Sequence, residues 1–258
     1  MCLILLAHAC HPRYRMILAA NRDEFHRRPT AAAAYWSDGR GLLGGRDLEA
    51  GGTWLAISRS GRMAAVTNYR DPAATAIKVR SRGQLVADFV RGAAAPHSYL
   101  MDVHGRRGAY NDFNLIVADG EEVWYLGSRG QGPQPVAPGI HGLSNHLLDT
   151  PWPKVAEGKA ALARLATTGE IAPEALLALL VDRGQPPDDR LPDTGVGLEW
   201  ERRLGSRFIV SPDYGTRSST VLLVSRQGPA TFCEWTFAPV TDPPTVAGRR
   251  CFKLTFER

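Results

Sequence analysis

The chain has 258 residues, of which 44% are apolar and 22% charged, and this length and composition allow one large domain or two small ones with a buried core. Its net charge is +5, but the arginines are scattered rather than gathered in one basic run, which argues against a nucleic-acid partner. No stretch comes near the roughly 18 consecutive apolar residues that a membrane-spanning helix requires, so no stable membrane insertion is expected.

Segments with strand character dominate both ends of the chain. Apolar runs bounded by turn residues predict strands at residues 2–8, 14–20, 42–47, 53–58, 62–69, 114–119, 122–128, 207–211, 220–225, 230–237 and 251–257. Helical periodicity occurs between these groups, at residues 82–92, 153–166 and 172–184. The segment 185–197 is rich in Pro, Asp and Gly and is expected to form a surface loop.

The strands and helices come in separate blocks and do not alternate regularly. A doubly wound parallel sheet would need a helix after each strand, whereas segregated blocks are typical of antiparallel sheets backed by helices. The sequence therefore predicts an α+β fold, organised as a single domain over residues 1–258.

The four cysteines show no close pairing in the sequence. Such spacing predicts free thiols in a reducing compartment, and therefore a cytoplasmic protein. A metal site is not expected, because His8, Cys10 and His11 lie close together but no second pair of ligands follows at a recognised spacing. The cysteines are Cys2, Cys10, Cys233 and Cys251.

The second residue of the chain is a thiol. If the initiator methionine is trimmed, Cys2 carries both a nucleophile and a free α-amine. The ordinary pKa values, about 8.5 for the thiol and about 7.7–8.0 for the amine, allow the amine to act as base when the sulfur attacks a carbonyl. The alternative is that Cys2 simply begins a buried strand, as small apolar cysteines often do.

A charged cluster, "NRDE", follows the second predicted strand. A turn near residues 10–14 would pair the first two strands so that position 2 lies opposite roughly position 22. Arg22 could then lower the pKa of the Cys2 thiol, and Asp23 could hold the amine. The alternative is that these side chains form surface ion pairs, which contribute little.

Several blocks together resemble the NRDE family, relatives of the transport and Golgi organisation proteins. The matching blocks run in order from residue 1 to about residue 225: "MCL", "ANRDEF", "GGTWLAIS", "VTNYR", "YNDFNLIV", "GLSNHLLDTPWPKV" and "DYGTRSSTVLLV". The family is similar to the N-terminal nucleophile (Ntn) hydrolases, and this resemblance implies a four-layer αββα sandwich of two antiparallel sheets flanked by helices.

The resemblance also implies a set of catalytic residues. Besides Cys2, Arg22 and Asp23, it points to Asn145 in "LSNH" as an oxyanion donor and to Arg217 in "GTRSST" as the residue that closes the site. Two features depart from the cysteine amidases: Arg22 and Asp23 are adjacent, although neighbouring side chains of a strand point to opposite faces, and Leu3 replaces the usual hydroxyl residue. The alternative is therefore a retained fold with changed chemistry.

Four further residues are candidates for ligand contact: Asn21, Trp54, Asn68 and His146. The motifs around the candidate residues also have structural alternatives. The Asn of "GLSNH" could cap the helix that starts at 153, and "GTRSST" could be a turn. The glycines of "GGTW" could allow close packing of the backbone, with Trp54 in the core.

Two functions remain open. In the first, the chain is a carrier for a small apolar ligand with an acidic group; the resemblance implies haem trafficking, with a thiolate or His146 on the iron and Arg22 or Arg217 on the propionates. In the second, it is a hydrolase or acyltransferase acting on an amide or thioester through Cys2. Neither requires a bound cofactor; haem would be cargo.

Overall fold

The computed structural model describes residues 2–38, 41–73, 78–120, 122–239 and 243–256. The chain forms two compact units: unit 1 comprises Met1–Arg27, Pro138–Ser144 and Asp149–Leu254, and unit 2 comprises Arg28–Ala137, Asn145–Leu148 and Thr255–Arg258. A single domain over residues 1–258 stays a prediction.

Unit 1 is built on a six-stranded antiparallel sheet, in the order β10-β1-β2-β11-β12-β13. The strands are β1 (Cys2–His8), β2 (Tyr14–Phe25), β10 (Gly139–Leu143), β11 (Tyr214–Ser225), β12 (Ala230–Phe237) and β13 (Val246–Leu254). The central strands β1, β2 and β11 are buried on both faces over most of their length, and this explains the apolar sequence of β1 and the apolar runs "MILAA" in β2 and "VLLV" in β11.

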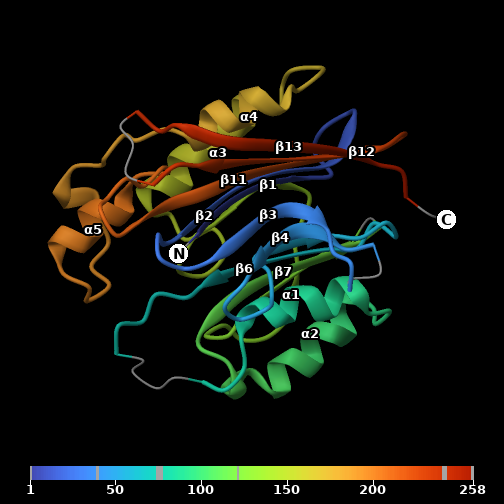
Figure 1. Ribbon diagram of the computed structural model, residues 1–258, viewed down its shortest axis with the longest axis horizontal. Helices are drawn as coiled ribbons and strands as arrows, with labels where there is room; N and C mark the ends of the chain where they lie inside the picture. The colour runs from blue at the N-terminus through green and yellow to red at the C-terminus, as the bar shows by residue number, and fades with distance from the viewer. Residues whose placement is uncertain (1, 39–40, 74–77, 121, 240–242, 257–258) are drawn as a thin grey trace. The chain divides into compact units, whose positions relative to one another are not determined.

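The helices of unit 1 are α3 (Pro153–Leu165), α4 (Pro173–Leu180) and α5 (Leu198–Gly205). Figure 1 shows α3 and α4 together on one side of the sheet. Alternate residues of β1, including Leu3 and Leu5, form a buried core with Val155, Leu162 and Leu176 from these two helices. Because this core faces α3 and α4, we call that side of the sheet the helix face.

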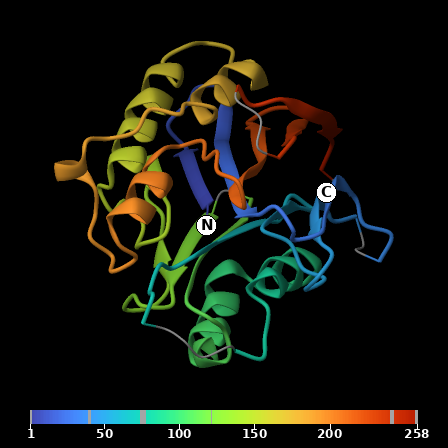
Figure 2. The same ribbon diagram turned by 60° about the vertical axis from the view of Figure 1, so that its left-hand side comes forward.

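Unit 2 has a seven-stranded antiparallel sheet in the order β3-β4-β5-β6-β7-β8-β9. The strands are β3 (Thr30–Tyr35), β4 (Leu43–Asp47), β5 (Leu55–Ile57), β6 (Met63–Asn68), β7 (Phe113–Asp119), β8 (Glu122–Gly127) and β9 (Gln134–Pro135). Helices α1 (Arg82–Arg91) and α2 (Pro96–Gly105) pack on it, as Figure 2 shows, around a core that contains Phe89 and Phe113.

Both units combine antiparallel strands with packed helices, so the predicted α+β class is confirmed. The three predicted helices occur as α1, α3 and α4, whereas α2 and α5 were not predicted. Helix α2 buries only Tyr99, Leu100 and Val103 besides its first residue, a pattern too sparse for a periodicity signal.

The prediction of a strand at 207–211 is wrong. Phe208 and Ile209 are buried, but the Phe208 amide bonds to the Asp182 carbonyl at 2.9 Å and the Ile209 amide to Thr216 Oγ1 at 2.9 Å, so the segment joins no sheet. The last predicted strand begins earlier than expected, at Val246, and the end of its predicted range, residue 257, lies outside the described residues.

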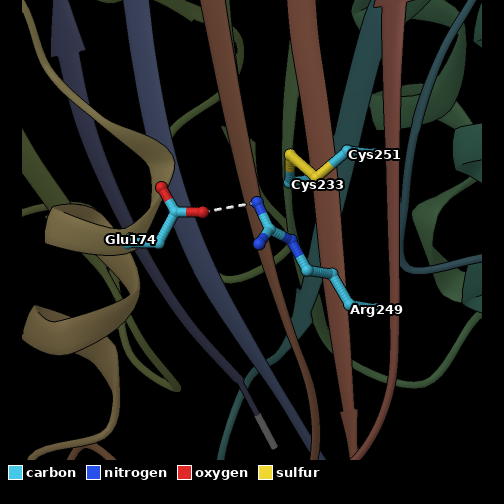
Figure 3. The surroundings of a disulfide bond; sticks show 4 residues. All are labelled: Glu174, Cys233, Arg249 and Cys251. Carbon is cyan, nitrogen blue, oxygen red and sulfur yellow. Dashed lines mark hydrogen bonds and ion pairs between the residues drawn. A yellow bond between two sulfur atoms is a disulfide. The ribbon is translucent and has the colours of Figure 1, made fainter.

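The prediction of four free cysteines is also wrong, because Cys233 and Cys251 form a disulfide (Figure 3). They lie directly opposite each other on β12 and β13, with their Cα atoms 4.1 Å apart. An ion pair between Arg249 on β13 and Glu174 on α4 lies nearby (Figure 3). Cys2 and Cys10 are free. The sequence argument for a reducing compartment therefore loses its basis.

Candidate functional site

Cys2 lies where the sequence predicted. It is the first residue of β1 and pairs with Arg22 of β2, so the predicted register is confirmed. The reason is local: Ala9 takes a positive φ of 52° and its amide bonds to the Arg15 carbonyl at 2.8 Å, which closes a tight connection between two long strands.

The Cys2 side chain is partly exposed and electrostatically constrained. Burial raises the pKa of the thiol and the Asp23 carboxylate acts in the same direction, while a hydrogen bond from the Asp23 backbone and the charge of Arg22 act to lower it. The Ser144 hydroxyl donates to the Cys2 carbonyl at 3.1 Å, and this bond ties the strand start to the end of β10. Burial thus favours the protonated thiol, and a base would assist its attack on a carbonyl.

Arg22 shares a face of the sheet with Cys2, because directly paired residues of antiparallel strands point the same way. Its side chain is only 5% exposed, and its Nη2 lies 3.9 Å from Glu24 Oε2. A guanidinium thus lies beside the thiol, as the sequence analysis expected.

Asp23 points to the helix face instead. Strand β2 runs without a turn through Phe25, so Arg22 and Asp23 alternate. The buried Asp23 carboxylate accepts from Thr216 Oγ1 at 2.7 Å. Burial raises its pKa, against the opposing charge of Lys154 on α3. Asp23 therefore affects the Cys2 thiol through a backbone hydrogen bond and through the negative charge of its carboxylate. The carboxylate itself faces α3.

Asn21 also belongs to the helix face. Its amide group donates to the carbonyls of Leu180 at 2.9 Å and Arg207 at 2.7 Å, and it accepts from the Ser219 hydroxyl at 2.6 Å. These contacts give Asn21 a structural role; its contact with a ligand stays a prediction.

Arg217 lies at an irregularity of β11, since the register with β2 shifts between Thr216 and Ser218. Its Nη1 donates to the carbonyls of Phe25 at 3.0 Å and His26 at 3.1 Å. Burial and the charge of Arg22 lower the pKa of Arg217, while the carboxylate of Glu24 opposes them, so the two guanidinium groups lie close enough to repel each other with Glu24 nearby. "GTRSST" is thus part of a strand and not a turn.

Cys2, Arg22 and Arg217 form what we call the cysteine–arginine cluster. Arg22 lies beside Cys2, Arg217 lies near Arg22, and the Glu24 carboxylate acts on both guanidinium groups. An arginine can bind a carboxylate with two parallel hydrogen bonds, so the cluster can accept an anionic group in addition to Glu24. Among the described residues, no group of three or more His, Cys, Asp or Glu side chains is arranged to hold a metal ion.

The candidates from the middle of the chain belong to unit 2. The fully buried Asn145 donates from Nδ2 to the Asn68 carbonyl at 3.0 Å, and its own carbonyl accepts from the Arg70 amide at 2.7 Å. The His146 ring lies 5.0 Å from that of Tyr69, and burial lowers the pKa of His146. Asn68 and Asn145, both candidates from the sequence, are therefore in contact. That they form one site with Cys2 stays a prediction.

The remaining candidate, Trp54, accepts a hydrogen bond on its carbonyl from the Val66 amide at 2.9 Å. The glycine just before "TW" has a packing role: a Cβ on Gly52 would lie 2.4 Å from the backbone of Gly83 at the start of α1. Asn145 does not cap α3, because Trp152 occupies that position. Contact between Trp54 and a ligand stays a prediction.

Three further residues did not stand out in the sequence: Ser144 and Ser218, which lie next to Cys2 and Arg22, and Lys154, which faces Asp23 on the helix face. Ser144 and Ser218 lie inside motifs that were singled out for other residues, "GLSNH" and "GTRSST". Lys154 gave no signal, because a lysine in the first turn of an amphipathic helix is expected on the surface, yet it is only 4% exposed.

The fold matches a known class. Over the whole chain the structure is similar to the C2A variant of conjugated bile acid hydrolase from Clostridium perfringens, with a TM-score of 0.50, 8% identity and 97% of that chain covered. The predicted Ntn-hydrolase-like fold is thereby confirmed as a fold.

Sequence comparison gives the family. The model of the family "Transport and Golgi organisation 2" matches residues 1–239. The chain is 42% identical over 255 residues to the transport and Golgi organization protein 2 homolog of Bos taurus, covering 91% of this chain and 92% of the relative. It is 39% identical to the Homo sapiens homolog over 256 residues, with the same coverage. The chain belongs to the transport and Golgi organisation 2 family, as the NRDE resemblance indicated.

No helix among the described residues is both long enough and apolar enough to cross a bilayer.

Proposed function

We propose that this protein binds a small, largely apolar ligand through an acidic group at the cysteine–arginine cluster, with haem as the leading ligand and haem trafficking as the role. The observation that carries this proposal is the pair of guanidinium groups, Arg22 and Arg217, on the sheet end that carries the Cys2 thiol.

The physical reason is charge. The two guanidinium groups repel each other, so a carboxylate between them would be stabilised by both, and the interaction is strengthened where water is largely excluded. The propionates of haem and the head group of a fatty acid both supply this carboxylate. Cys2 could bind iron as thiolate, because coordination to a metal removes the proton that burial otherwise retains.

A haemin titration followed at the Soret band tests the proposal. We expect a saturable shift for the wild-type protein and binding at least 10-fold weaker for Arg217→Gln. Arg226→Gln is the matched control, because Arg226 likewise donates to two backbone carbonyls, those of Ala9 and His11, but lies at the other end of β11. Equal affinity of all three proteins would refute a role for the cluster.

A palmitate displacement assay separates haem from acyl ligands. If haemin gives no saturable shift but palmitate binds and Arg217→Gln weakens it, the ligand is an acyl compound. If neither probe binds near stoichiometry, the carrier function is wrong.

The second candidate is a hydrolase or acyltransferase that acts on an amide or thioester. Its supporting observations are the Ntn-hydrolase-like fold and a Cys2 side chain that is partly exposed at a strand start. In this reaction the sulfur forms a bond to the carbonyl carbon, the base moves the thiol proton to the leaving amine or thiol, and water or another acceptor then releases the acyl group. The base would be the α-amine of Cys2, which requires removal of the initiator methionine.

Intact mass spectrometry after incubation with an activated acyl ester tests this candidate. We expect one acyl group on the wild-type protein and on Cys10→Ala, which removes the other free thiol, and none on Cys2→Ala. Labelling that persists in Cys2→Ala, or a retained methionine in the unlabelled protein, would exclude the mechanism.

The proposal includes a cytoplasmic location. Differential alkylation of Cys233 and Cys251 in protein taken directly from cells tests it: reduced thiols fit the cytoplasm, and a complete disulfide indicates an oxidising compartment.

A further inference from the structure

One row of side chains crosses four neighbouring strands of unit 1 at the cysteine–arginine cluster. Cys2 of β1 pairs with Arg22 of β2, Arg22 with Ser218 of β11, and Ser218 with Thr236 of β12. Because directly paired residues share a face, all four side chains project from the sheet side opposite the helix face.

Ser218 is the unusual member of this row. It is only 4% exposed, and its hydroxyl is buried with no hydrogen-bond partner among the described residues. Buried polar groups are almost always paired, since leaving one unpaired costs about 1–3 kcal/mol. The Ser218 hydroxyl is therefore a candidate for contact with a ligand.

The neighbouring hydroxyls show the contrast. Ser219 is fully buried on the helix face and donates to Asn21 Oδ1 at 2.6 Å. Thr216 donates to Asp23 Oδ1 at 2.7 Å. Strand β11 thus satisfies its hydroxyls on the helix face, while the hydroxyl beside Arg22 is left available.

We infer that the Ser218 hydroxyl positions the ligand by donating a hydrogen bond to the carboxylate oxygen that Arg22 binds. This inference rests on the proposed function and adds a residue to it. A carboxylate has two oxygens with about four acceptor sites in total. A bidentate guanidinium occupies only two of these sites, so the carboxylate can also accept a hydrogen bond from the Ser218 hydroxyl.

The Ser218 hydroxyl also affects which ligands are preferred. A carboxylate accepts from Arg22 and Ser218 together, whereas an ester has lost the charge that makes these bonds strong. Ser218 therefore favours the free acid over its ester. A water molecule or a purely structural role for Ser218 would confer no such preference.

The test measures binding of haemin and of haemin dimethyl ester to Ser218→Ala, with Ser219→Ala as the matched control on the other face. We expect Ser218→Ala to weaken haemin binding about 10- to 100-fold, in line with one lost charge-assisted hydrogen bond, and to leave ester binding unchanged. Ser219→Ala should bind both compounds as the wild-type protein does. Equal affinity of Ser218→Ala and wild type for haemin, or equal losses for acid and ester, would overturn the inference.

Thermal unfolding without ligand gives a second, independent readout. Removing an unpaired buried hydroxyl leaves Tm unchanged or raises it, whereas Ser219→Ala, which loses a made hydrogen bond, lowers Tm by about 2–4 °C. A comparable drop for Ser218→Ala would mean that its hydroxyl is structural, and would overturn the inference without any ligand.

The two proposals can fail separately. If wild-type protein binds haemin and Arg22→Gln weakens binding while Ser218→Ala does not, only the role of Ser218 is wrong. If wild-type protein binds neither haemin nor palmitate, the proposed function is wrong and the ligand role of Ser218 is lost with it.

Discussion

Asp149 closes the loop that carries Asn145, and its charge should make the stability of the protein depend on pH. Its carboxylate accepts from the Gly142 amide at 2.9 Å and from Lys159 Nζ at 2.6 Å, and it pairs with His141 Nδ1 at 2.7 Å. The Asp149 amide in turn donates to the Gly142 carbonyl at 2.8 Å. Partial burial acts to raise the pKa of Asp149, but the bonds from His141 and Lys159 outweigh it and lower the pKa from 3.8 to about 2.

The size of the effect follows from that change. A carboxyl group whose pKa falls from 3.8 to about 2 on folding stabilises the native state by about 2.5 kcal/mol at neutral pH. Because the Asp149 side chain is 32% exposed, solvent screening reduces this to about 1–1.5 kcal/mol. The native pKa is the lower one, so this stabilisation is fully present above about pH 4 and is lost as pH falls from about 4 towards 2.

Asp149→Asn removes the charge and keeps a residue that tolerates the backbone φ of 61°. We expect urea unfolding to show a loss of about 1–1.5 kcal/mol at pH 7 and a shrinking difference from wild type between pH 4 and pH 3. Asp38→Asn is the control, because its exposed ion pair with Arg46 should contribute little. An equal loss at pH 7 and pH 3, or no loss at pH 7, would refute the reasoning.

Three further changes test the fold. Reducing the Cys233–Cys251 disulfide should lower the free energy of unfolding by about 3 kcal/mol, because the bond links residues 18 apart in sequence and restricts the unfolded chain. Denaturant unfolding with and without reductant measures this difference. Arg62→Leu should cost about 3–5 kcal/mol, because the buried guanidinium bonds three acceptors that would lose their donor, and denaturant unfolding of this variant should show a lower midpoint at unchanged m-value. Gly52→Ala should cost about 1–3 kcal/mol, because its Cβ would meet the Gly83 backbone at 2.4 Å; a Tm equal to wild type would contradict this contact.

Local patterns predicted the elements that have strong periodicity and clear boundaries. Helices α1, α3 and α4 start and end within a few residues of the predicted positions, because Pro or Ser marks their starts and apolar residues recur on one face. The pairing of Cys2 with Arg22 was also predictable, since a short connection between two long strands leaves little freedom in register.

Other features depend on neighbours that are distant in sequence. Asn21 and Arg22 are adjacent, yet one bonds to a carbonyl of α4 and the other lies beside the Cys2 thiol, and only the strand alternation shown by the structure separates these roles. The disulfide was hidden for the same reason, because nothing in the sequence shows that β12 and β13 pair with Cys233 opposite Cys251.

The sequence alone determined the fold class, the family and the thiol at the start of β1, because composition, periodicity and ordered motifs are properties of short segments. Only the tertiary structure decided that Asp23 faces α3, that Ser218 shares a row with Cys2 and Arg22, and that its hydroxyl has no partner among the described residues. The physical reason is that a side chain's partners are set by register and burial across strands nearly 200 residues apart in sequence, as in the pairing of Asn21 with Ser219, and these depend on the packing of the whole sheet.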